Sequence, residues 1–389
     1  MAKKSAKHGF LLSEKFDYSI LIITLLLLSI GLIMLLSAST PTSLAENDNS
    51  YTYVLKQGVM VIIGLAGMWI VSKIDYRNYR KLKWIIYVGF VALLFIVGFF
   101  GTYSHGARRW INIGGFSFQP SEFAKVAFII FFAALLAGLK EKNILKKPVP
   151  GFLYPIILLI PIILAVFKKQ NHLSATLIMC FITLVQMFVA GSNIKIFLAG
   201  GITGVVGIVI YVIKELLGDG GGFRGGRIQT WLNLDADLTG SGWQINQSLY
   251  AIGSGGMFGL GLGNSKQKYL YLPEPQNDFI FSVLAEELGF IGCVTVILLF
   301  ALFIWRGIVI ALRADDLFGT LIAIGVTTLI GLEAMINIAV VTNTIPVTGM
   351  PLPFFSYGGS AMLANLIAVG LLLSVSRNSK KNNVKEVEN

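Results

Sequence analysis

Long runs of apolar residues alternate with short polar segments along almost the whole chain. About ten of these runs are long enough for a helix to cross roughly 30 Å of hydrocarbon. A segment in lipid must satisfy its own backbone hydrogen bonds, so an apolar run of this length indicates a helix. The predicted spans are Asp17–Ser37, Val54–Ser72, Leu82–Gly101, Ser121–Leu139, Gly151–Phe167, Leu173–Ala190, Ile194–Ile213, Asp278–Trp305, Leu317–Val341 and Gly359–Val375.

The composition agrees with this pattern. Of the 389 residues, 55% are hydrophobic and only 13% are charged, whereas a soluble domain carries about 25% charged residues. We therefore expect an all-α polytopic membrane protein with about ten transmembrane helices. The membrane domain is expected at 17–376, with a large extracellular loop at 214–277 between the seventh and eighth spans. Cytoplasmic tails are expected at 1–16 and 377–389.

The distribution of charge predicts the orientation of the spans. The net charge is +11, and most basic residues lie in short segments between apolar runs. With the N-terminus in the cytoplasm, about 20 of the 31 lysines and arginines fall on the cytoplasmic side, as the positive-inside rule requires. Nucleic acid is not an expected partner, because no basic face with interleaved aromatic residues is present. The first apolar run exceeds the core of a typical signal peptide, so we expect it to be retained.

In this orientation the conspicuous polar loops face outside. They are "TYSHGARRWINIGGFSFQP", the loop at 214–277 and "TNTIPVTGMPLPFFSYGG". The last of these is rich in proline and glycine and cannot be a regular helix in lipid, so it must line protein or a watery cavity. Functional residues concentrate in loops held by a rigid scaffold. We therefore expect the chemistry at the outer membrane surface.

Three acidic residues in the stretch "YLPEPQNDFIFSVLAEELG" are candidates for function. Asp278 begins the eighth predicted span. It is either a helix-start carboxylate that meets the helix dipole or a general base whose pKa is raised at the lipid boundary. Glu286 and Glu287 lie deeper in the span. Intramembrane carboxylates are functional or are paired inside the bundle, and both interpretations stay open.

Charged residues of the second outer loop and the fourth span form another group of candidates. Arg108 and Arg109 either anchor lipid headgroups or clamp a phosphate with their planar donors. Lys268 adds positive charge on the same face. Glu122 and Lys125 are three residues apart, so a local ion pair is geometrically available, and we favour a structural or gating role for them.

Metal and dinucleotide sites are not expected. The cysteines Cys180 and Cys293 lie in apolar runs, the histidines are scattered, and neither HExxH nor CxxC occurs. The glycine-rich "GLGLGN" follows no predicted strand, so we interpret it as a turn that packs an outer segment at the membrane surface.

Three long motifs resemble the SEDS family (shape, elongation, division and sporulation proteins), whose members include FtsW, RodA and SpoVE. They are "GARRWINIGGFSFQPSEFAK", "GSGWQINQSLYAIGSGGMFGLGLGNSKQKYLYLPEPQNDFIFSVLAEELG" and "IPVTGMPLPFFSYGGS". The resemblance covers essentially the whole chain. It implies a peptidoglycan glycosyltransferase that polymerises lipid II at the outer face of the bacterial plasma membrane. It also implies a class B penicillin-binding protein, lipid II, membrane lipids and other division or sporulation proteins as partners.

The resemblance assigns the central role to one residue. The family's essential aspartate matches Asp278, which becomes the candidate general base. Many members have "PDLGT" where this chain has "QNHLSAT". Asn171 and His172 thus replace a Pro-Asp pair, and any role of a carboxylate there does not transfer. The "YLPEPQNDFIF" and "PVTG" forms look more like the FtsW and SpoVE branches than like RodA.

The remaining site residues divide into two groups. The candidate substrate-binding residues are Arg108, Arg109, Lys268, His172 and Ser356. The candidate structural or gating residues are Glu122, Lys125, Glu286 and Glu287. No residue is assigned to a metal, although a divalent cation, Mg or Mn, could help a pyrophosphate to leave.

Two alternatives from other functional classes stay open. A lipid II flippase would use intramembrane charges such as Glu286, Glu287 and Glu333, and it needs a charged path that both sides of the membrane can reach. A non-catalytic division scaffold would not need Asp278. The concentration of unusual loops on one face favours chemistry at the membrane surface.

Overall fold

A computed structural model describes residues 16–104, 107–113, 116–193, 195–197, 201, 230–233, 240–269 and 271–378. Within these residues, nine helices are long and apolar enough to cross a membrane. The chain is therefore a multi-pass membrane protein, as the hydrophobic pattern predicts. The expected seventh span, Ile194–Ile213, lies almost entirely outside the described residues, as do parts of the loop at 214–277 and most of both tails.

The described elements follow one another as a series of helices with one small sheet. They are α1 (Tyr18–Asn47), α2 (Thr52–Lys73), a 3-10 helix (Tyr76–Leu82), α3 (Lys83–Phe100), β1 (Thr102–Ser104), β2 (Ala107–Ile113), β3 (Phe116–Phe118), α4 (Pro120–Glu141), a π-helical turn (Val149–Leu153), α5 (Tyr154–Ile163), a second π-helical turn (Leu164–Lys169), α6 (Leu173–Ala190), α9 (Ser241–Ser254), α10 (Ile280–Arg313), α11 (Leu317–Val341) and α12 (Gly359–Arg377).

Nine of the predicted spans coincide with these helices, but two of the helices extend well beyond the predicted ends. Helix α1 continues past the predicted end at Ser37 to Asn47. The Thr40 hydroxyl donates to the Leu36 carbonyl at 2.6 Å, so polar residues are accommodated within this helix. Helix α10 begins at Ile280, two residues after Asp278, and continues beyond Trp305 to Arg313.

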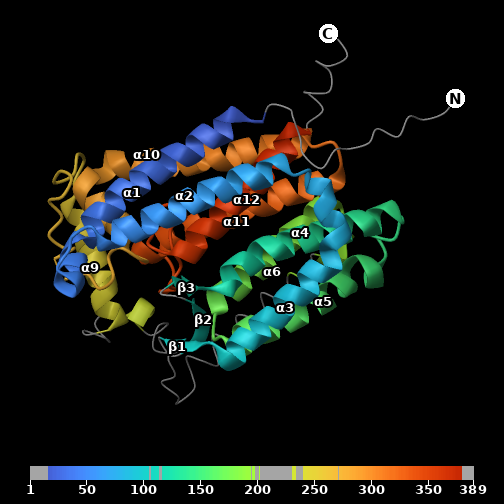
Figure 1. Cartoon of the computed structure of the whole chain (residues 1–389), viewed down its shortest axis with the longest axis horizontal. Helices are drawn as coiled ribbons and strands as arrows, with labels where there is room; N and C mark the ends of the chain where they lie inside the picture. The colour runs from blue at the N-terminus through green and yellow to red at the C-terminus, as the bar shows by residue number, and fades with distance from the viewer. Residues whose placement is uncertain are drawn as a thin grey trace, which may run out of the picture.

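The helices pack as two groups (Figure 1). Helices α1, α2, α10, α11 and α12 lie side by side in one group, and α3, α4, α5 and α6 form the other. Helix α4 joins the groups through contacts with α11 and α12. Both α4 and α12 are mostly buried, which is unlike the lipid-exposed α2 and α3. The core is therefore helix against helix.

The two ends of the bundle differ in character. The tail end, where α1 begins and α12 ends, contains short connectors with ion pairs, including Arg306–Asp17 at 2.6 Å and Arg77–Asp316 at 3.1 Å. The loop end, opposite, contains α9, the long loops and a three-stranded antiparallel sheet of order β1-β2-β3. The sequence did not predict this sheet, which replaces an expected irregular loop.

Helix α10 is broken at Gly289, whose φ of 65° and ψ of −166° are not helical. The glycine loop, defined as 255–263, enters the break. Leu260 N and Gly261 N donate to the carbonyls of Glu286 and Glu287 at 2.9 and 3.0 Å, and Phe290 N donates to Gly256 O at 2.8 Å. The freed backbone groups of a broken membrane helix must be satisfied in this way. The "GLGLGN" motif therefore fixes the loop at 255–263 to α10.

A second irregular segment, the re-entrant segment at 350–357, enters the bundle from the loop end. Met350, Leu352, Phe354 and Phe355 are all buried, and the rings of Phe354 and Phe355 lie near those of Phe303 and Phe300 on α10. A Cβ at Gly31 of α1 would lie only 2.2 Å from Phe354 O. The prediction that this proline- and glycine-rich stretch lines protein is thus confirmed.

Candidate functional site

Asp278 lies in the turn that leads into α10 at the loop end, and it is half-buried. The side-chain amide of Asn337 on α11 donates to Asp278 O and to Met350 O, both at 2.8 Å. A Cβ built on Gly349, which has a φ of 68°, would lie 3.4 Å from Asp278 Oδ2. The backbone of Asp278 is therefore fixed from α11, and its carboxylate lies beside a residue with no side chain.

Asp278 lies one residue before the N-cap of α10, so the helix-start interpretation stays open beside the catalytic one. The N-cap residue of α10 is Phe279, whose own side chain makes no capping hydrogen bond. The side-chain amide of Asn277, the residue before Asp278, donates to Glu274 Oε2 at 3.0 Å. Asp278 is thus held in a turn outside the first helical residues.

The loop between α11 and α12 connects Asp278 to the start of α6. Tyr357 N donates to Gln276 O at 2.8 Å, and Ser174 Oγ donates to Thr348 O at 3.0 Å. Because Thr348 adjoins Gly349, these contacts place the first turn of α6 next to the segment that faces Asp278. Gly349, Thr348 and Ser174 were not predicted as site residues, because their role depends on long-range packing.

His172 and Arg109 lie together at this start of α6. Arg109 donates to the carbonyls of Gln170 and Asn171, each at 2.8 Å. Burial, together with the positive charges of Arg109 and Lys125, lowers the pKa of His172 to about 3. Its Nδ1 has no hydrogen-bond partner among the described residues. His172 is therefore neutral near pH 7 and can donate or accept a hydrogen bond to a polar ligand.

Arg108 does not accompany Arg109. The two are consecutive residues of β2, and consecutive side chains of a strand point to opposite faces of the sheet. Arg108 is exposed and donates to Phe99 O at the end of α3. The structure therefore brings Arg109 to His172 and separates Arg108 from both.

The predicted ion pair between Glu122 and Lys125 is confirmed, and it belongs to a larger buried network. Lys125 Nζ donates to Glu122 Oε2 at 2.8 Å and also to Glu333 on α11. Asn365 on α12 donates to the second Glu333 oxygen at 3.3 Å. A buried charge is tolerated when it is paired in this way. Because Asn337 follows Glu333 by one helical turn, α11 connects the network to the backbone of Asp278.

Glu286, Glu287 and Lys268 form a separate buried cluster at the break in α10. Lys268 Nζ donates to Glu287 Oε1 at 2.8 Å, to Ser37 Oγ at 2.8 Å and to Gly263 O at 2.7 Å. Glu286 accepts from Lys266 N at 2.9 Å. The three ammonium donors of Lys268 are thus used within the protein. The expected role of Lys268 in substrate binding stays a prediction, whereas a structural role of both glutamates agrees with these contacts.

Ser356, the remaining candidate, lies inside the re-entrant segment. Its hydroxyl accepts from Leu352 N at 2.8 Å, and its carbonyl accepts from Gln57 Nε2 at 3.2 Å. The side chain is buried. These contacts hold the turn that precedes α12, and contact with substrate stays a prediction.

Metal ligands are not clustered in the described part of the chain. No group of three or more His, Cys, Asp or Glu side chains there could hold a metal ion. No step is assigned to the divalent cation considered from the sequence, and a requirement for it stays a prediction.

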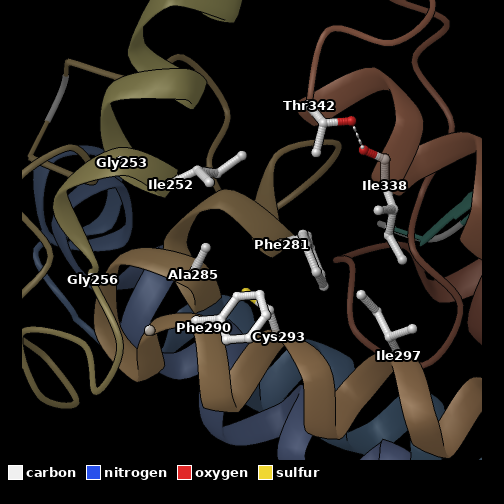
Figure 2. Close-up of a pocket in the computed structure, with 11 residues that line it drawn as sticks. Ile252, Gly253, Gly256, Phe281, Ala285, Phe290, Cys293, Ile297, Ile338 and Thr342 are labelled. Atoms are coloured by element: carbon white, nitrogen blue, oxygen red, sulfur yellow. Dashed lines mark hydrogen bonds between the residues drawn. The ribbon is translucent and has the colours of Figure 1, made fainter.

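An apolar cavity of about 280 Å³ lies beside the site, between α9, α10 and α11 (Figure 2). Phe281 and Ala285 line it before the break in α10, and Phe290 and Cys293 line it after the break. Phe281 is three residues from Asp278. This lining suits hydrocarbon, so an acyl or prenyl chain could lie close to the polar residues.

The chain as a whole matches a known protein family. The model of the FtsW/RodA/SpoVE family, described as "Cell cycle protein", matches residues 18–381. The chain belongs to this family. The resemblance inferred from three sequence motifs is thereby confirmed over nearly the entire chain.

Individual family members are similar over their full lengths. Stage V sporulation protein E of Bacillus subtilis (strain 168) is 44% identical over 372 residues, which cover 94% of this chain and 98% of that protein. The probable peptidoglycan glycosyltransferase FtsW of Geobacter sp. (strain M18) is 39% identical over 366 residues, covering 93% and 97%. This member of the FtsW/RodA/SpoVE family thus resembles both named branches that the motifs indicated.

Two solved structures share the fold. A chain from a peptidoglycan synthase complex, studied for the coordination of polymerization and crosslinking, has a TM-score of 0.76 and 25% identity, and covers 93% of this chain and 98% of its own length. The rod shape determining protein RodA of Thermus thermophilus has a TM-score of 0.67 and 26% identity, covering 94% and 98%. The family fold therefore extends across almost all of this chain.

Proposed function

We propose that this protein is a peptidoglycan glycosyltransferase in which Asp278 is the general base. The observation that carries the proposal is the setting of Asp278. Its carboxylate is half-buried at the loop end beside Gly349, and Asn337 holds its backbone at 2.8 Å. Relatives that cover nearly the whole chain are named probable peptidoglycan glycosyltransferases.

In the proposed reaction, a proton transfer to Asp278 is followed by formation of one glycosidic bond and cleavage of another. Asp278 takes the proton from the 4-hydroxyl of the GlcNAc at the acceptor lipid II. The resulting oxygen attacks the anomeric carbon of the reducing-end MurNAc on the growing strand. The bond from that carbon to undecaprenyl pyrophosphate breaks, and inversion gives the β-1,4 link. The proton stays on Asp278 until it exchanges with water.

Two groups at the start of α6 suit the charge that develops. Pyrophosphate leaves with concentrated negative charge, which a guanidinium binds well, and we assign this role to Arg109. The neutral imidazole of His172, with its unbonded Nδ1, is suited to a sugar hydroxyl or a phosphate oxygen. Arg108, Lys268 and Ser356 are weaker candidates because none of them lies with His172. Arg108 donates to Phe99 O at the end of α3, Lys268 pairs with Glu287 at the break in α10, and Ser356 holds the turn before α12.

The buried network argues against the flippase alternative. A flippase needs charged groups along a path that both sides of the membrane can reach. Glu122, Lys125 and Glu333 are at most 3% exposed, and the single ammonium of Lys125 pairs with both carboxylates between α4, α11 and α12. Their arrangement suits a support for the site at the loop end.

Orientation and partners follow from the same proposal. We infer that the loop end faces outward from the bacterial plasma membrane and that both termini are cytoplasmic, because the basic connectors gather at the tail end. One solved relative belongs to a complex that coordinates polymerization with crosslinking. A class B penicillin-binding transpeptidase is therefore the proposed partner, with lipid II as substrate, in cell division or sporulation.

The decisive experiment replaces Asp278 by asparagine. Asp278→Asn protein, purified with its transpeptidase partner, should polymerise lipid II at least about 100-fold more slowly, since a general base contributes about 10²–10⁴ in rate. The matched control is Asp48→Asn, because Asp48 is an exposed carboxylate at the end of α1. Unchanged thermal unfolding of both variants shows that folding is intact. Normal glycan synthesis by Asp278→Asn would falsify the assignment and favour the scaffold alternative.

A further inference from the structure

A second cavity, of about 420 Å³, lies at the loop end next to the segment that carries Asp278. Its walls come from the end of α1, the start of α2, the segment leading to Asp278, and the residue before the glycines that start α12. The lining residues that the argument uses are Glu46, Tyr53, Glu274, Gln276, Asn277 and Tyr357. The mechanism described above uses none of these residues.

The lining of this cavity offers hydrogen-bond acceptors and negative charge. Glu46 and Glu274 contribute two carboxylates, and no lysine or arginine is among the residues that line it. Gln276 is only 3% exposed, and its Oε1 has no hydrogen-bond partner within the described chain. The Asn277 Oδ1 is buried and unbonded as well. Buried acceptors without partners cost free energy, so a donor-rich cation would complete this lining.

The cavity is also preorganised. Pro273 and Pro275 restrict the backbone on either side of Glu274, which has a left-handed φ of 49°. Strained backbone of this kind gathers at functional sites. The rings of Tyr53 and Tyr357 meet edge to face with centroids 4.8 Å apart. Burial raises the pKa of the Tyr357 hydroxyl, so this side chain stays a neutral aromatic that can contact a cation.

The chemistry of the lining favours an organic cation over a metal ion. The rings of Tyr53 and Tyr357 line the cavity beside the carboxylates, and aromatic faces attract an organic cation, whereas a hydrated metal ion depends on oxygen ligands alone. A primary ammonium group has three donors and one positive charge, which matches two carboxylates and two unbonded amide oxygens. The lipid-linked substrate carries such a group, because the peptide of a peptidoglycan precursor contains a diamino acid.

We propose that this cavity is a subsite for the ammonium group of the peptide on the lipid-linked substrate. The inference rests on the function proposed above and adds a determinant of substrate specificity to it. The wall that ends in Gln276 and Asn277 continues directly into Asp278, so a substrate held at Asp278 can extend its peptide toward the cavity. An ethanolamine headgroup of a membrane lipid offers the same ammonium chemistry, and the experiment distinguishes the two sources.

The test compares two substrates in steady-state polymerisation. One is lipid II with the free side-chain amine, and the other is lipid II acetylated on that amine. The full-length protein, with its partner, is reconstituted in phosphatidylglycerol vesicles, with and without phosphatidylethanolamine. Variants are Glu274→Gln and Glu46→Gln, and the matched control is Asp48→Asn, which removes a carboxylate at the same end outside the cavity.

We expect acetylation to raise KM about 10-fold or more with kcat nearly unchanged, since hydrogen bonds to charged groups contribute about 1.5–3 kcal/mol. Glu274→Gln and Glu46→Gln should raise KM for the free amine and leave KM for the acetylated substrate unchanged. Asp48→Asn should alter neither value. Equal KM values for both substrates, or a difference present only with phosphatidylethanolamine, would overturn the proposal.

Binding to Asp278→Asn protein separates this inference from the proposed function. The two forms of lipid II are titrated against this variant, so the result does not depend on turnover. Tighter binding of the free amine supports the subsite even where polymerisation is absent, and equal binding contradicts it. Failure of the proposed function is seen independently, as polymerisation that persists in Asp278→Asn.

Discussion

The contact between the glycine loop and α10 predicts a large effect of one methyl group. An alanine at Gly259 would place its Cβ 2.1 Å from Glu287 O and 2.4 Å from Glu287 C. Both atoms are backbone, so they cannot rotate away as a side chain would. The loop or the first half of α10 must move, and that half follows directly from Asp278.

The magnitude follows from strain and from lost hydrogen bonds. Gly259 has a φ of 79°, and a left-handed conformation costs a residue with a Cβ roughly 1–2 kcal/mol. Moving the loop breaks the bonds from Leu260 N to Glu286 O and from Gly261 N to Glu287 O, at 2.9 and 3.0 Å. Each is worth a net 0.5–1.5 kcal/mol or so. Gly259→Ala should therefore destabilise the protein by about 2–5 kcal/mol.

Gly263 offers a matched control in the same loop. Its φ is 84°, yet no atom lies within 4 Å of the position that a Cβ would take. Gly263→Ala should therefore lose only the strain, about 1–2 kcal/mol. Thermal unfolding of the purified variants, together with lipid II polymerisation, measures the difference. Similar losses of unfolding temperature and of activity in the two variants would refute the reasoning from close approach.

Three further predictions concern the site and its support. Asn337→Leu removes the donor to Asp278 O and Met350 O, so kcat for polymerisation should fall about 10-fold or more with little change in KM, and an unchanged kcat contradicts the positioning role. Lys125→Met leaves two carboxylates buried without their cation and should destabilise the protein by about 3–5 kcal/mol. Thermal unfolding measures this, and addition of Glu333→Gln should recover part of the loss. The pKa of His172 is lowered to about 3 in the folded protein. As pH falls from about 6.5 toward 3, the imidazole therefore binds a proton in the unfolded chain but stays neutral in the folded one. Stability should therefore decrease over this range by up to about 1.4 kcal/mol per pH unit, and His172→Asn should remove that part of the slope in thermal unfolding against pH.

Much of the fold could be predicted from the sequence because hydrophobic periodicity and length decide whether a segment crosses the membrane. The span Leu317–Val341 was predicted with the boundaries that α11 has. The end of α1 was missed because its last turns are polar, and a helix end depends on local bonds such as that of Thr40. The break at Gly289 was missed because its cause, the glycine loop, is distant in sequence.

Parts of the site could be predicted where the type and spacing of the residues alone indicate an interaction. An i, i+3 pattern predicted the pair of Glu122 and Lys125, which the structure contains. A carboxylate at the boundary of an apolar span made Asp278 a candidate, the family resemblance assigned it the role of general base, and that role stays a prediction. Asn365 was missed, although a lone amide within an apolar span is a usable signal. The separation of Arg108 from Arg109 was not foreseeable, because it follows from a strand that the loop sequence did not indicate.

The re-entrant segment also sets a rule for hybrid proteins assembled from different family members. Its carbonyl at Phe354 occupies the space that a side chain at Gly31 would need, and its rings lie near Phe300 and Phe303. A donor sequence for 350–357 therefore fits only when the facing stretches of α1 and α10 come from the same parent. Crossover points are better chosen in the connectors at the tail end, where the partners are long, adaptable charged side chains.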